Sequence, residues 1–563
     1  MDGSGSGRVT AAIEREAFDA IVIGAGINGA GIARDAAMRG LRVLLLDKGD
    51  IGGGTTSWST RLIHGGLRYL EYREVGLVRE SLRERERLLR AAPHLVRPLP
   101  LVIPIYGGDR RGPWLIRAGM LAYDALSFDK SLARHRMLSR AEALARVPGL
   151  DPAGLVGAAV YYDAQVEYAE RLAVENALSA RNHGATLLTY ARVDRPLIEG
   201  GAVRGVAFTD LVGGGRHEAR AAVTLNVAGP WVDQVLTGAI GANGTANGTA
   251  RLVGGTKGSH VIVAPFPGAP ADALYVEARR DGRPYFVVPW NGLYLIGTTD
   301  SRFEGDLNRV EADEGEIAYL IGETNRVLPG ATLTRDSVLY TYSGVRPLPY
   351  TAGGAAGAIT RRHVVHNHAA AGLPGLFSIV GGKLTTYRNL AEQAVDEVCR
   401  ALGRPAGAST GGTADAPLPG ASPVDGRDLA AVRQRLAATP GLAPATANHL
   451  LRVYGTRALR VLALADGDGA PDLRAPFDPI SGAIGAEVVL AFREEGATTL
   501  ADALLRRTMV GLGPDVGIGP DAVAAAVAQR HLGWDAARGE REVAAYRDHV
   551  ARFHPRRLAR ALR

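Results

Sequence analysis

The sequence predicts an α/β (α+β) protein in which a Rossmann-like dinucleotide-binding domain is interrupted by a mixed-sheet cap and followed by an all-α C-terminal domain. Three observations lead to this fold class. Residues 18–47 combine an apolar run, a GxGxxG turn, a helical pattern and a second apolar run. A further glycine turn at 381–385 opens another helical pattern. Residues 429–563 are patterned almost entirely as helix.

The first strand–turn–helix unit has the parts of a pyrophosphate site. Its strand pattern, 19–23, leads into the GxGxxG turn, and a helix is expected over about 27–39. Gly24 permits the tight turn, Gly26 lets the backbone approach a pyrophosphate, and Gly29 lets helix and strand pack closely. The helix N-terminus then presents free N–H groups and a partial positive charge to the phosphates.

The second strand pattern, 41–46, ends in Asp47, a carboxylate placed to accept hydrogen bonds from ribose hydroxyls. The following loop, 48–60, is rich in Gly, Ser and Thr, and its hydroxyls could contact a second phosphate or simply form a solvated turn. Next comes RLIHGGLRYL, in which His64 and the pair Arg68-Tyr69 flank two glycines. A lone histidine is more often structural, but its position directly after a cofactor loop indicates a site.

Composition limits the classes of function. With 563 residues, 46% hydrophobic and 22% charged, the chain is expected to fold into three or four ordinary domains. No apolar run is long enough to span a bilayer, and the first seventeen residues lack the apolar core of a secretory signal. The single cysteine, Cys399, excludes an internal disulfide and a multi-cysteine metal site, so no metal is expected and a cytoplasmic location fits. The net charge of +7 favours acidic partners, but no nucleic-acid-binding motif occurs.

Strand and helix patterns alternate along the middle of the chain. One strand, 219–227, ends in Ala228-Gly229-Pro230-Trp231, a turn where a ligand can approach the backbone. A hairpin is expected at 285–297, and the low-complexity stretch 236–250 is expected to be a surface loop. Helices are further expected at 71–91, 114–150, 313–328 and 385–401, a strand leading into a helix at 160–185, and strands at 93–113, 186–193, 203–209, 261–264, 337–347 and 376–380.

These patterns divide the chain as follows. Residues 1–17 are expected to be a loose tail, and 403–428 a linker before the helical domain, 429–563. The domain between them spans 18–402. Its dinucleotide-binding segments are placed at about 18–105, 155–235 and 345–402, and its cap segments at about 106–154 and 236–344.

Eight motifs, in order, resemble those of the FAD-dependent, quinone-linked glycerol-3-phosphate dehydrogenases. They read IVIGAGINGAGIARDAAMRG, LIHGGLRYLE, NVAGPWV, KGSH, IGTTD, TYSGVRPL, ITR and GGKLTTYR, and the helical C-terminus is similar as well. The resemblance implies oxidation of sn-glycerol 3-phosphate to dihydroxyacetone phosphate. Hydride passes from C2 to flavin N5, and the electrons pass on to a membrane quinone.

The resemblance also implies roles for particular residues. Arg346 and Arg361 are expected to clamp the substrate phosphate, because guanidinium groups match phosphate oxygens, and Arg68 and Tyr69 to add contacts. Lys383 is expected near the flavin ring as a catalytic residue, where it would bind substrate or, together with the helix dipole, stabilise negative charge on the reduced flavin. His64 and His260 are candidates for the proton acceptor, with His64 slightly favoured, because an unshifted imidazole titrates near neutral pH. The FAD contacts expected are Gly24, Gly26, Asn28, Gly29, Asp47, Lys48, Thr55, Thr56, Ser57, His64, Gly66, Val193, Ala228, Gly229, Asp300, Gly381, Gly382, Lys383, Leu384 and Thr385.

Alternatives stay open. The nearest is an oxidase of the same family that passes electrons to O2, although no long extra insertion is visible. An amine or amino-acid oxidase, or a non-catalytic flavoprotein, would share the fold but would leave the arginine clamp unexplained. Use of a quinone implies peripheral association with the inner face of the cell membrane. The basic tail 551–563 is one candidate anchor and is otherwise a solvated helix end, and a homodimer stays open.

Overall fold

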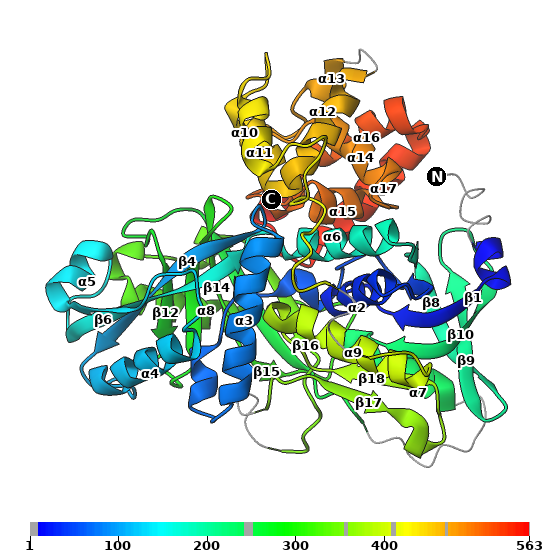
Figure 1. Ribbon diagram of the computed structural model, residues 1–563. Coiled ribbons are helices and arrows are strands. Elements are labelled where there is room, and N and C mark those ends of the chain that lie inside the picture. The colour runs from blue at the N-terminus through cyan, green and yellow to red at the C-terminus, as the bar shows by residue number, and fades with distance from the viewer. Residues whose placement is uncertain (1–9, 241–250, 354–358, 407–411, 468–470, 562–563) are drawn as a thin grey trace.

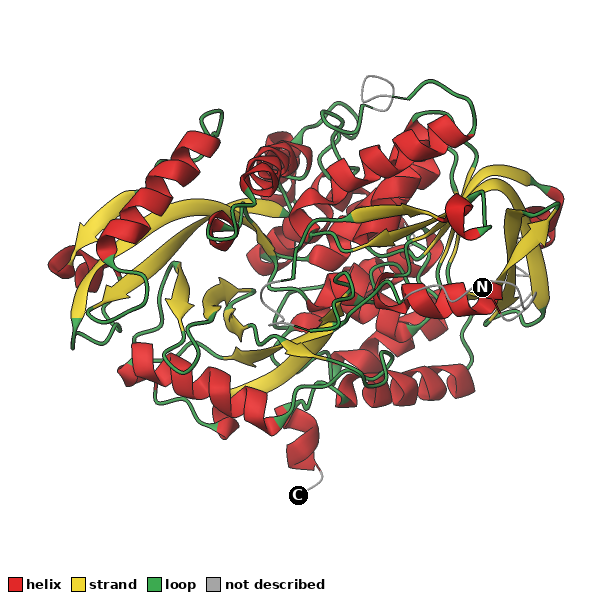
Figure 2. Ribbon diagram, turned by 90° about the horizontal axis from the view of Figure 1, so that it is seen from below, coloured by secondary structure: helices red, strands yellow, loops and turns green. Residues whose placement is uncertain are grey.

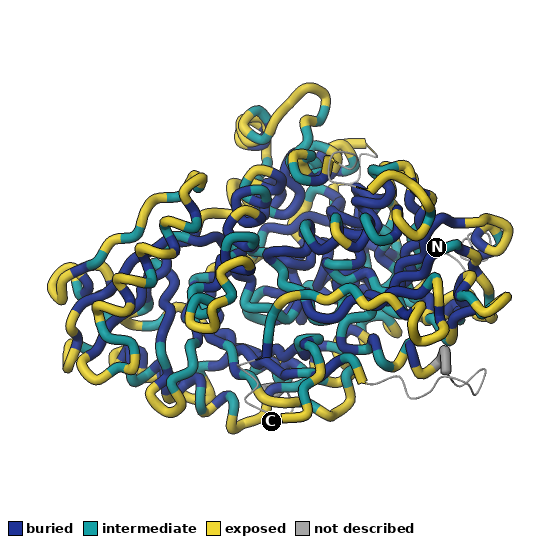
Figure 3. The backbone as a smooth tube through the Cα atoms, turned by 60° about the horizontal axis from the view of Figure 1, so that its bottom comes forward, coloured by how far each residue is buried: buried dark blue, intermediate teal, exposed yellow. Residues whose placement is uncertain are grey.

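The computed structural model describes residues 10–240, 251–353, 359–406, 412–467 and 471–561. Two sheets lie side by side, and a helical domain packs against them (Figure 1). Seen from below, the strands form one group toward the left of the molecule and another toward the right, with helices packed around both groups (Figure 2). Most of the chain through the centre is buried, and exposed segments form the outer turns (Figure 3).

The first sheet has eight strands and a parallel centre. Its main path runs β17-β18-β10-β1-β2-β7, and the parallel pairs are β1 with β10 and β2, β10 with β18, and β2 with β7. This is the predicted Rossmann-like unit. The strands are β1 (Ala17–Ile23), β2 (Val43–Leu46), β7 (Thr186–Leu188), β8 (Ala191–Glu199), β9 (Ala202–Asp210), β10 (Arg216–Asn226), β17 (Val364–Asn367) and β18 (Leu376–Val380).

Three helices pack together beside the parallel strands: α2 (Ile27–Met38), α6 (Ala169–Asn182) and α9 (Tyr387–Ala401). Their apolar faces and the strands share one buried cluster. The packing is close, because a Cβ added at Gly31 of α2 would lie 2.8 Å from the Tyr387 ring. The glycine therefore sets the separation of α2 and α9. Helix α7 (Val232–Ile240) follows β10 and replaces the start of the loop expected at 236–250, whose remainder lies outside the described residues.

The second sheet, the cap, has ten strands in the order β15-β11-β14-β13-β12-β4-β6-β3, with β16 paired to β11 and β5 to β6. Its hairpin β13–β14 is the one expected from the sequence. The helices associated with the cap are α3 (Val75–Ala91), α4 (Pro113–Leu126), α5 (Arg140–Arg146) and α8 (Glu314–Val327). The strands are β3 (Leu62–Ile63), β4 (Val96–Tyr106), β5 (Arg136–Ser139), β6 (Leu155–Val166), β11 (Thr256–Val263), β12 (Ala273–Glu277), β13 (Pro284–Trp290), β14 (Leu293–Gly297), β15 (Ser301–Arg302) and β16 (Val338–Arg346).

Two sequence-based boundaries differ from this pairing. Strands β4 and β6 were expected within dinucleotide-binding segments, but they pair with each other in the cap over most of their length. The reason is that both strands are long and apolar, and such strands do not show from sequence which sheet they join. The helix expected over 114–150 is likewise interrupted, because β5 pairs with β6 between α4 and α5.

The C-terminal domain is helical, as expected. It comprises α10 (Leu429–Ala437), α11 (Pro444–Tyr454), α12 (Ala458–Gly467), α13 (Pro471–Arg474), α14 (Gly485–Arg493), α15 (Leu500–Asp502), the π-helical turn Ala503–Arg507, α16 (Pro520–Leu532), α17 (Ala536–Ala551) and α18 (Arg556–Ala561). It is tied to α6 by an ion pair between Arg171 and Glu495, 2.6 Å apart and inaccessible to solvent.

Two segments expected to be loose are folded where they are described. Residues 10–15 of the predicted tail are helical, and Ile13 is buried. Within the predicted linker, Leu418 is fully buried and its N–H donates to the carbonyl of Ala91. Composition indicated flexibility, but one well-placed apolar side chain and backbone hydrogen bonds hold the linker in place.

Candidate active site

A cavity of about 880 Å³ lies where the three parts of the molecule meet. The β1–α2 turn borders it from one side, cap residues such as His260 and Arg346 from another, and Arg506, His549 and Arg552 of the C-terminal domain from a third. The sequence-predicted residues that border it are Gly24, Gly26, Asn28, Asp47, Lys48, Thr55, Thr56, His64, Tyr69, Val193, Ala228, Gly229, His260, Arg346, Arg361, Gly381, Gly382, Lys383, Leu384 and Thr385.

The β1–α2 turn needs its glycines. Gly24 has φ +105°, and a Cβ there would lie 2.6 Å from the Val227 carbonyl oxygen. A Cβ at Gly29 would lie 1.8 Å from the Gly24 oxygen. Gly29 is thus required for helix–strand packing, and it does not itself border the cavity as a cofactor contact.

Asp47 is held by the backbone around that turn. Its two carboxylate oxygens accept hydrogen bonds from the N–H groups of Ala25, at 2.5 Å, and Gly49, at 2.8 Å. Burial raises the pKa of Asp47, although the two N–H groups oppose the shift. The carboxylate is therefore fixed at the cavity wall at the end of β2, where ribose hydroxyls are bound in dinucleotide folds.

The three hydroxyls after this strand do different things. Thr56 Oγ accepts a hydrogen bond from the N–H of Ile27 at 3.0 Å, and Thr55 Oγ donates to the Val345 carbonyl at 2.7 Å. Ser57 was expected to contact the cofactor, but it is buried away from the cavity and donates to the Gly52 carbonyl. The helical turn at Thr55–Trp58 accounts for this, because it points successive side chains in different directions.

The donors and acceptors along this half of the cavity fit a dinucleotide. Asn28 Oδ1 and Trp231 Nε1 are buried polar atoms with no hydrogen-bond partner in the described part of the chain. Both residues border the cavity, one beside the N-terminus of α2 and one after β10. Unpaired buried polar atoms are rare in folded proteins, so a polar group within the cavity is needed to satisfy them.

Cationic side chains gather at the other end of the cavity. One carboxylate, Asp300, receives both cavity arginines: its Oδ1 lies 3.2 Å from Arg346 Nη1 and its Oδ2 3.3 Å from Arg361 Nη2. Burial raises the pKa of Asp300, but the two guanidinium charges outweigh it and lower the pKa overall. Asp300, which was expected to contact the cofactor, does not border the cavity in this structure; it contacts the two arginines from outside the cavity.

Lys383 and Tyr69 complete this end. Lys383 Nζ donates to Ser81 Oγ at 2.8 Å and lies 4.4 Å from the centre of the Tyr69 ring. Burial lowers the pKa of Lys383 to about 7. Arg68 and Gly66, expected as contacts, do not border the cavity: Arg68 hydrogen-bonds the Tyr72 hydroxyl, and Gly66 takes φ +79° to turn the chain.

The two histidines border the cavity but do not have the expected pKa. Burial, followed by the charges of Lys383 and Arg85, lowers the pKa of His64 to about 3. His260 is buried, its Nε2 lies 3.0 Å from Thr60 Oγ, and burial lowers its pKa as well. The expectation of an imidazole that titrates near neutral pH is therefore wrong, because sequence does not reveal burial among cations.

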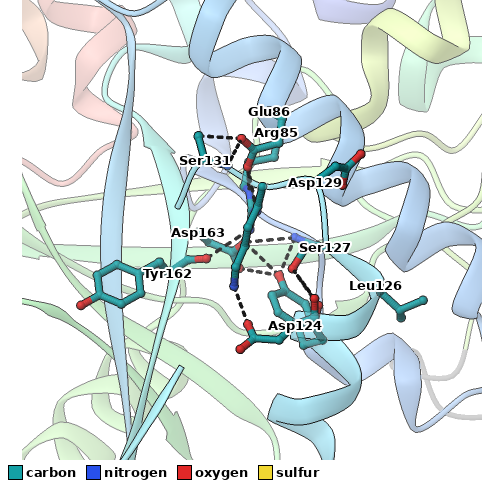
Figure 4. Close-up of polar contacts among 12 residues, drawn as sticks. Arg85, Glu86, Asp124, Leu126, Ser127, Asp129, Ser131, Tyr162 and Asp163 are labelled. Carbon is teal, nitrogen blue, oxygen red and sulfur yellow. Dashed lines mark hydrogen bonds and ion pairs between the residues drawn. The ribbon is translucent and has the colours of Figure 1, made fainter. Parts of the chain in front are cut away.

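Figure 4 shows part of a buried polar network around Arg85 and Asp163, and this network also supports the backbone after His64. Asp163 of β6 accepts hydrogen bonds from Arg85 of α3, at 2.6 Å, and from the hydroxyl of Tyr123 of α4, at 2.7 Å. The N–H of Gly65 donates to that hydroxyl at 2.9 Å. Because every group is buried and paired, the network fixes the backbone that carries His64.

Sequence reasoning missed the C-terminal residues at the cavity. Arg506 pairs with Asp50 and Asp502, and Arg552 donates to His549 Nε2 at 2.9 Å. Arg552 also lies 5.4 Å from the Trp58 ring, and burial together with Arg506 lowers its pKa to about 10. Arg506 lies in the stretch 500–513, which resembles the family's C-terminal domain but did not indicate a site, and His549 and Arg552 lie in no recognised motif.

Comparison with known proteins agrees with this geometry. Residues 19–388 match the family of FAD-dependent oxidoreductases, and 412–539 match the C-terminal domain of alpha-glycerophosphate oxidase. The chain is 48% identical over 544 residues to a glycerol-3-phosphate dehydrogenase of Synechocystis sp., covering 96% of this chain and 97% of that protein. The chain belongs to the FAD-dependent glycerol-3-phosphate dehydrogenase family.

Two further proteins are similar to this chain, one in sequence and one in fold. A D-erythritol 1-phosphate dehydrogenase of Brucella abortus is 41% identical over 500 residues, covering 88% of this chain and 95% of that protein. A Bacillus halodurans glycerol-3-phosphate dehydrogenase complexed with FAD has the same fold, with a TM-score of 0.78, 24% identity and 98% coverage of each chain. The cofactor of this flavoprotein oxidoreductase is FAD, as expected.

Proposed function

We propose that this enzyme oxidises sn-glycerol 3-phosphate at C2 to dihydroxyacetone phosphate. The observation that carries the proposal is the cluster of Arg346, Arg361 and Lys383 at one end of a cavity whose other end fits a dinucleotide. FAD, when bound, supplies the acceptor for the C2 hydride at its N5 atom. The hydroxyl proton must then go to a group of the protein as the C2–O bond becomes a carbonyl.

The two cavity arginines are proposed to bind the substrate phosphate. Two guanidinium groups share one carboxylate, Asp300, so the group of three keeps a net positive charge for a dianion. Because Asp300 contacts each arginine from outside the cavity, both are oriented before the substrate binds. Tyr69 borders the same end and offers a hydroxyl to the substrate.

The proton acceptor is proposed to be Lys383. Its pKa of about 7 means that about half of the empty enzyme carries a neutral amine at neutral pH, and a catalytic base works best at such a pKa. His64, favoured from sequence, has a pKa near 3, which makes it a weak base. We assign His64 a substrate-orienting role and His260 a role in holding Thr60 at the wall.

A second candidate substrate is D-erythritol 1-phosphate, because a relative named for it is 41% identical. The same clamp would bind its phosphate. Purified FAD-loaded enzyme should be assayed by dye reduction with glycerol 3-phosphate, erythritol 1-phosphate and unphosphorylated glycerol. Glycerol 3-phosphate is expected to have the highest kcat/KM, and glycerol to be nearly inert. Equal rates with glycerol and glycerol 3-phosphate would show that the arginines do not bind a substrate phosphate, and would contradict the proposal.

The electron acceptor is proposed to be a membrane quinone, reached by peripheral association with the inner face of the cell membrane. The dehydrogenase names of the full-length relatives support this acceptor, whereas the C-terminal family model carries the name of an oxidase. Among the described residues no helix combines the length and the apolarity needed to cross a bilayer. Measuring hydrogen peroxide during turnover in air distinguishes a quinone acceptor from O2. One peroxide formed per substrate oxidised would show that O2, and not a quinone, is the acceptor.

A further inference from the structure

The outer face of α4 is apolar although it is exposed. Trp114 is 79% exposed, Leu115 59% and Leu121 56%, and Phe128, just beyond the helix, is 79% exposed. Trp114 and Phe128 are the most exposed of the large apolar residues described. Ala118, Ala122 and Ala125 fill the rest of the face. An exposed apolar group of this kind marks a contact surface.

The opposite face of the same helix is packed into the protein. Ile116, Met120 and Tyr123 are buried in the cap core. The helix is thus fixed to the body of the molecule, at the outer end of the cap beside α3 (Figure 1). Its exposed side chains therefore belong to a well-packed helix and are not exposed because the segment is partly unfolded.

Most charges around this face are paired. Arg111 is paired with Glu71 and Glu277, and Lys130 with Asp124. Within α4 the exposed charged residue is Arg117, whose guanidinium lies 5.9 Å from the Trp114 ring, and the exposed Asp129 follows Phe128 at the other end. Arg79 of α3 likewise lies 4.6 Å from the Phe128 ring. Arg79 is paired with Asp129, so the cation that can meet an anionic headgroup is Arg117 beside Trp114. An aromatic ring with a cation next to it is suited to the boundary between acyl chains and headgroups.

We propose that Trp114, Leu115, Leu121 and Phe128 insert into the interface of a bilayer that contains anionic lipid. The proposal deepens the membrane association proposed above, on which it rests, by assigning the surface. The helix has 14 residues, too few to span a bilayer, for which about 20 are needed. It is suited to lie in the membrane plane, where two aromatic residues anchor its ends and Arg117 reaches the headgroups.

This surface replaces the tail as the preferred anchor. Phe553 of the tail is buried, and Arg557 is paired with Asp515. The apolar side of residues 551–558 is therefore already used in packing against the protein, and the exposed residues among them are Ala551 and Arg557. Interfacial binding needs apolar area as well as charge.

The test uses FAD-loaded full-length enzyme and sedimentation with phosphatidylcholine vesicles, with and without phosphatidylglycerol. Trp114→Glu/Leu121→Glu/Phe128→Glu is expected to lower partition onto anionic vesicles by about a hundredfold or more, since three apolar insertions are lost. The matched control is Ile480→Glu/Val523→Glu, which changes apolar residues that are 58% and 45% exposed on the C-terminal domain. It should bind as the parent does. A second control, Arg556→Glu/Arg557→Glu, tests the tail.

The fluorescence of Trp114 reports whether this face of α4 enters the acyl-chain region of the bilayer. Brominated acyl chains should quench tryptophan fluorescence in the parent and much less in Trp114→Phe. Unchanged vesicle binding of the triple variant, or equal quenching in both proteins, would overturn the proposal. So would lipid-free light scattering that showed a parent dimer and a monomeric triple variant, because the face would then be covered by a second copy. Dye-linked oxidation of glycerol 3-phosphate in solution is a separate readout, so loss of the proposed function and loss of this surface are distinguishable.

Discussion

The ammonium group of Lys383 lies 4.4 Å from the centre of the Tyr69 ring, and both side chains border the cavity. The ring face offers the cation some electrostatic compensation, and Ser81 accepts one hydrogen bond. These contacts do not offset burial, and the pKa of Lys383 falls to about 7. The lysine is therefore the cavity group whose charge changes across the pH range in which the enzyme is expected to work.

Lys383 should determine the acidic limb of the pH profile. Below its pKa the amine is protonated and cannot accept the hydroxyl proton, so kcat/KM should rise with pH and level off above about 7. Lys383→Arg keeps a positive charge but loses the titration, so this limb should disappear with a large fall in rate. His64→Asn should keep the limb. If Lys383→Arg kept the acidic limb of the parent's pH profile, the proton acceptor would be another group.

Arg346→Ala should weaken substrate binding and leave FAD in place. Loss of one charge-assisted contact to phosphate costs about 2–3 kcal/mol, so KM for glycerol 3-phosphate should rise by about 30- to 150-fold. The ratio of flavin to protein absorbance should stay at the parent value. Arg362→Ala is the matched control, because that arginine is exposed and does not border the cavity. An unchanged KM in Arg346→Ala would remove this residue from the clamp.

Arg552→Ala should shorten the lifetime of the FAD complex. Arg552 borders the cavity, and its described hydrogen bonds go to uncharged groups, His549 and the Asn308 carbonyl, which leaves its charge available to an anionic cofactor. Stopped-flow recovery of flavin fluorescence after dilution should show release about tenfold faster. Arg541 is an exposed arginine on α17, the helix that Arg552 directly follows, and Arg541→Ala should release FAD at the parent rate. Identical release by both variants would leave the C-terminal domain without a role at the cofactor.

Glu495→Gln should destabilise the protein. Glu495 is buried and paired with Arg171 and Arg457; burial opposes but does not outweigh these charges, and its pKa falls to about 2. Removing one partner of a buried pair costs about 3–5 kcal/mol. Because the folded-state pKa is depressed, this stabilisation is full above about pH 4.5 and is lost as pH falls toward 2.

The neighbouring residue gives a matched control. Glu494 pairs with Arg460 on the surface, where 29% and 54% of the two side chains are exposed. Glu494→Gln should change the midpoint of thermal unfolding by little, because exposed pairs contribute at most about 1 kcal/mol. Thermal unfolding at pH 7 compares the two variants. Equal midpoints would show that the buried pair does not stabilise the domain contact.

The parts predicted well from sequence are those that depend on neighbours in the chain. The β1–α2 turn is an example, because a steric requirement at Gly24 and Gly29 is visible in the sequence itself. The contacts of Asp300 were not predictable, since they depend on how β16 and the segment after it return to the cavity. The same holds for β4 and β6, whose pairing in the cap follows from a long-range alignment.

The pKa values of the cavity residues were the least predictable feature of the site. His64 and Lys383 both lie in motifs that indicated a site, and both do border the cavity. Their pKa values, about 3 and about 7, mean that Lys383, and not His64, titrates near neutral pH. Burial is the largest cause of both shifts, and the charges of Lys383 and Arg85 add to it at His64. Burial depends on the folded structure and cannot be read from the neighbouring residues in the sequence.

The cavity wall joins residues from both ends of the chain, from Gly24 to Arg552. A chain still being synthesised can fold the β1–α2 turn early, yet it has no complete cofactor chamber until α17 has been made and has docked. Loading with FAD is therefore a late event in biogenesis, and it can report that the whole chain has folded. A protein shortened before α17 would present an open chamber, and flavin content would distinguish it from the finished enzyme.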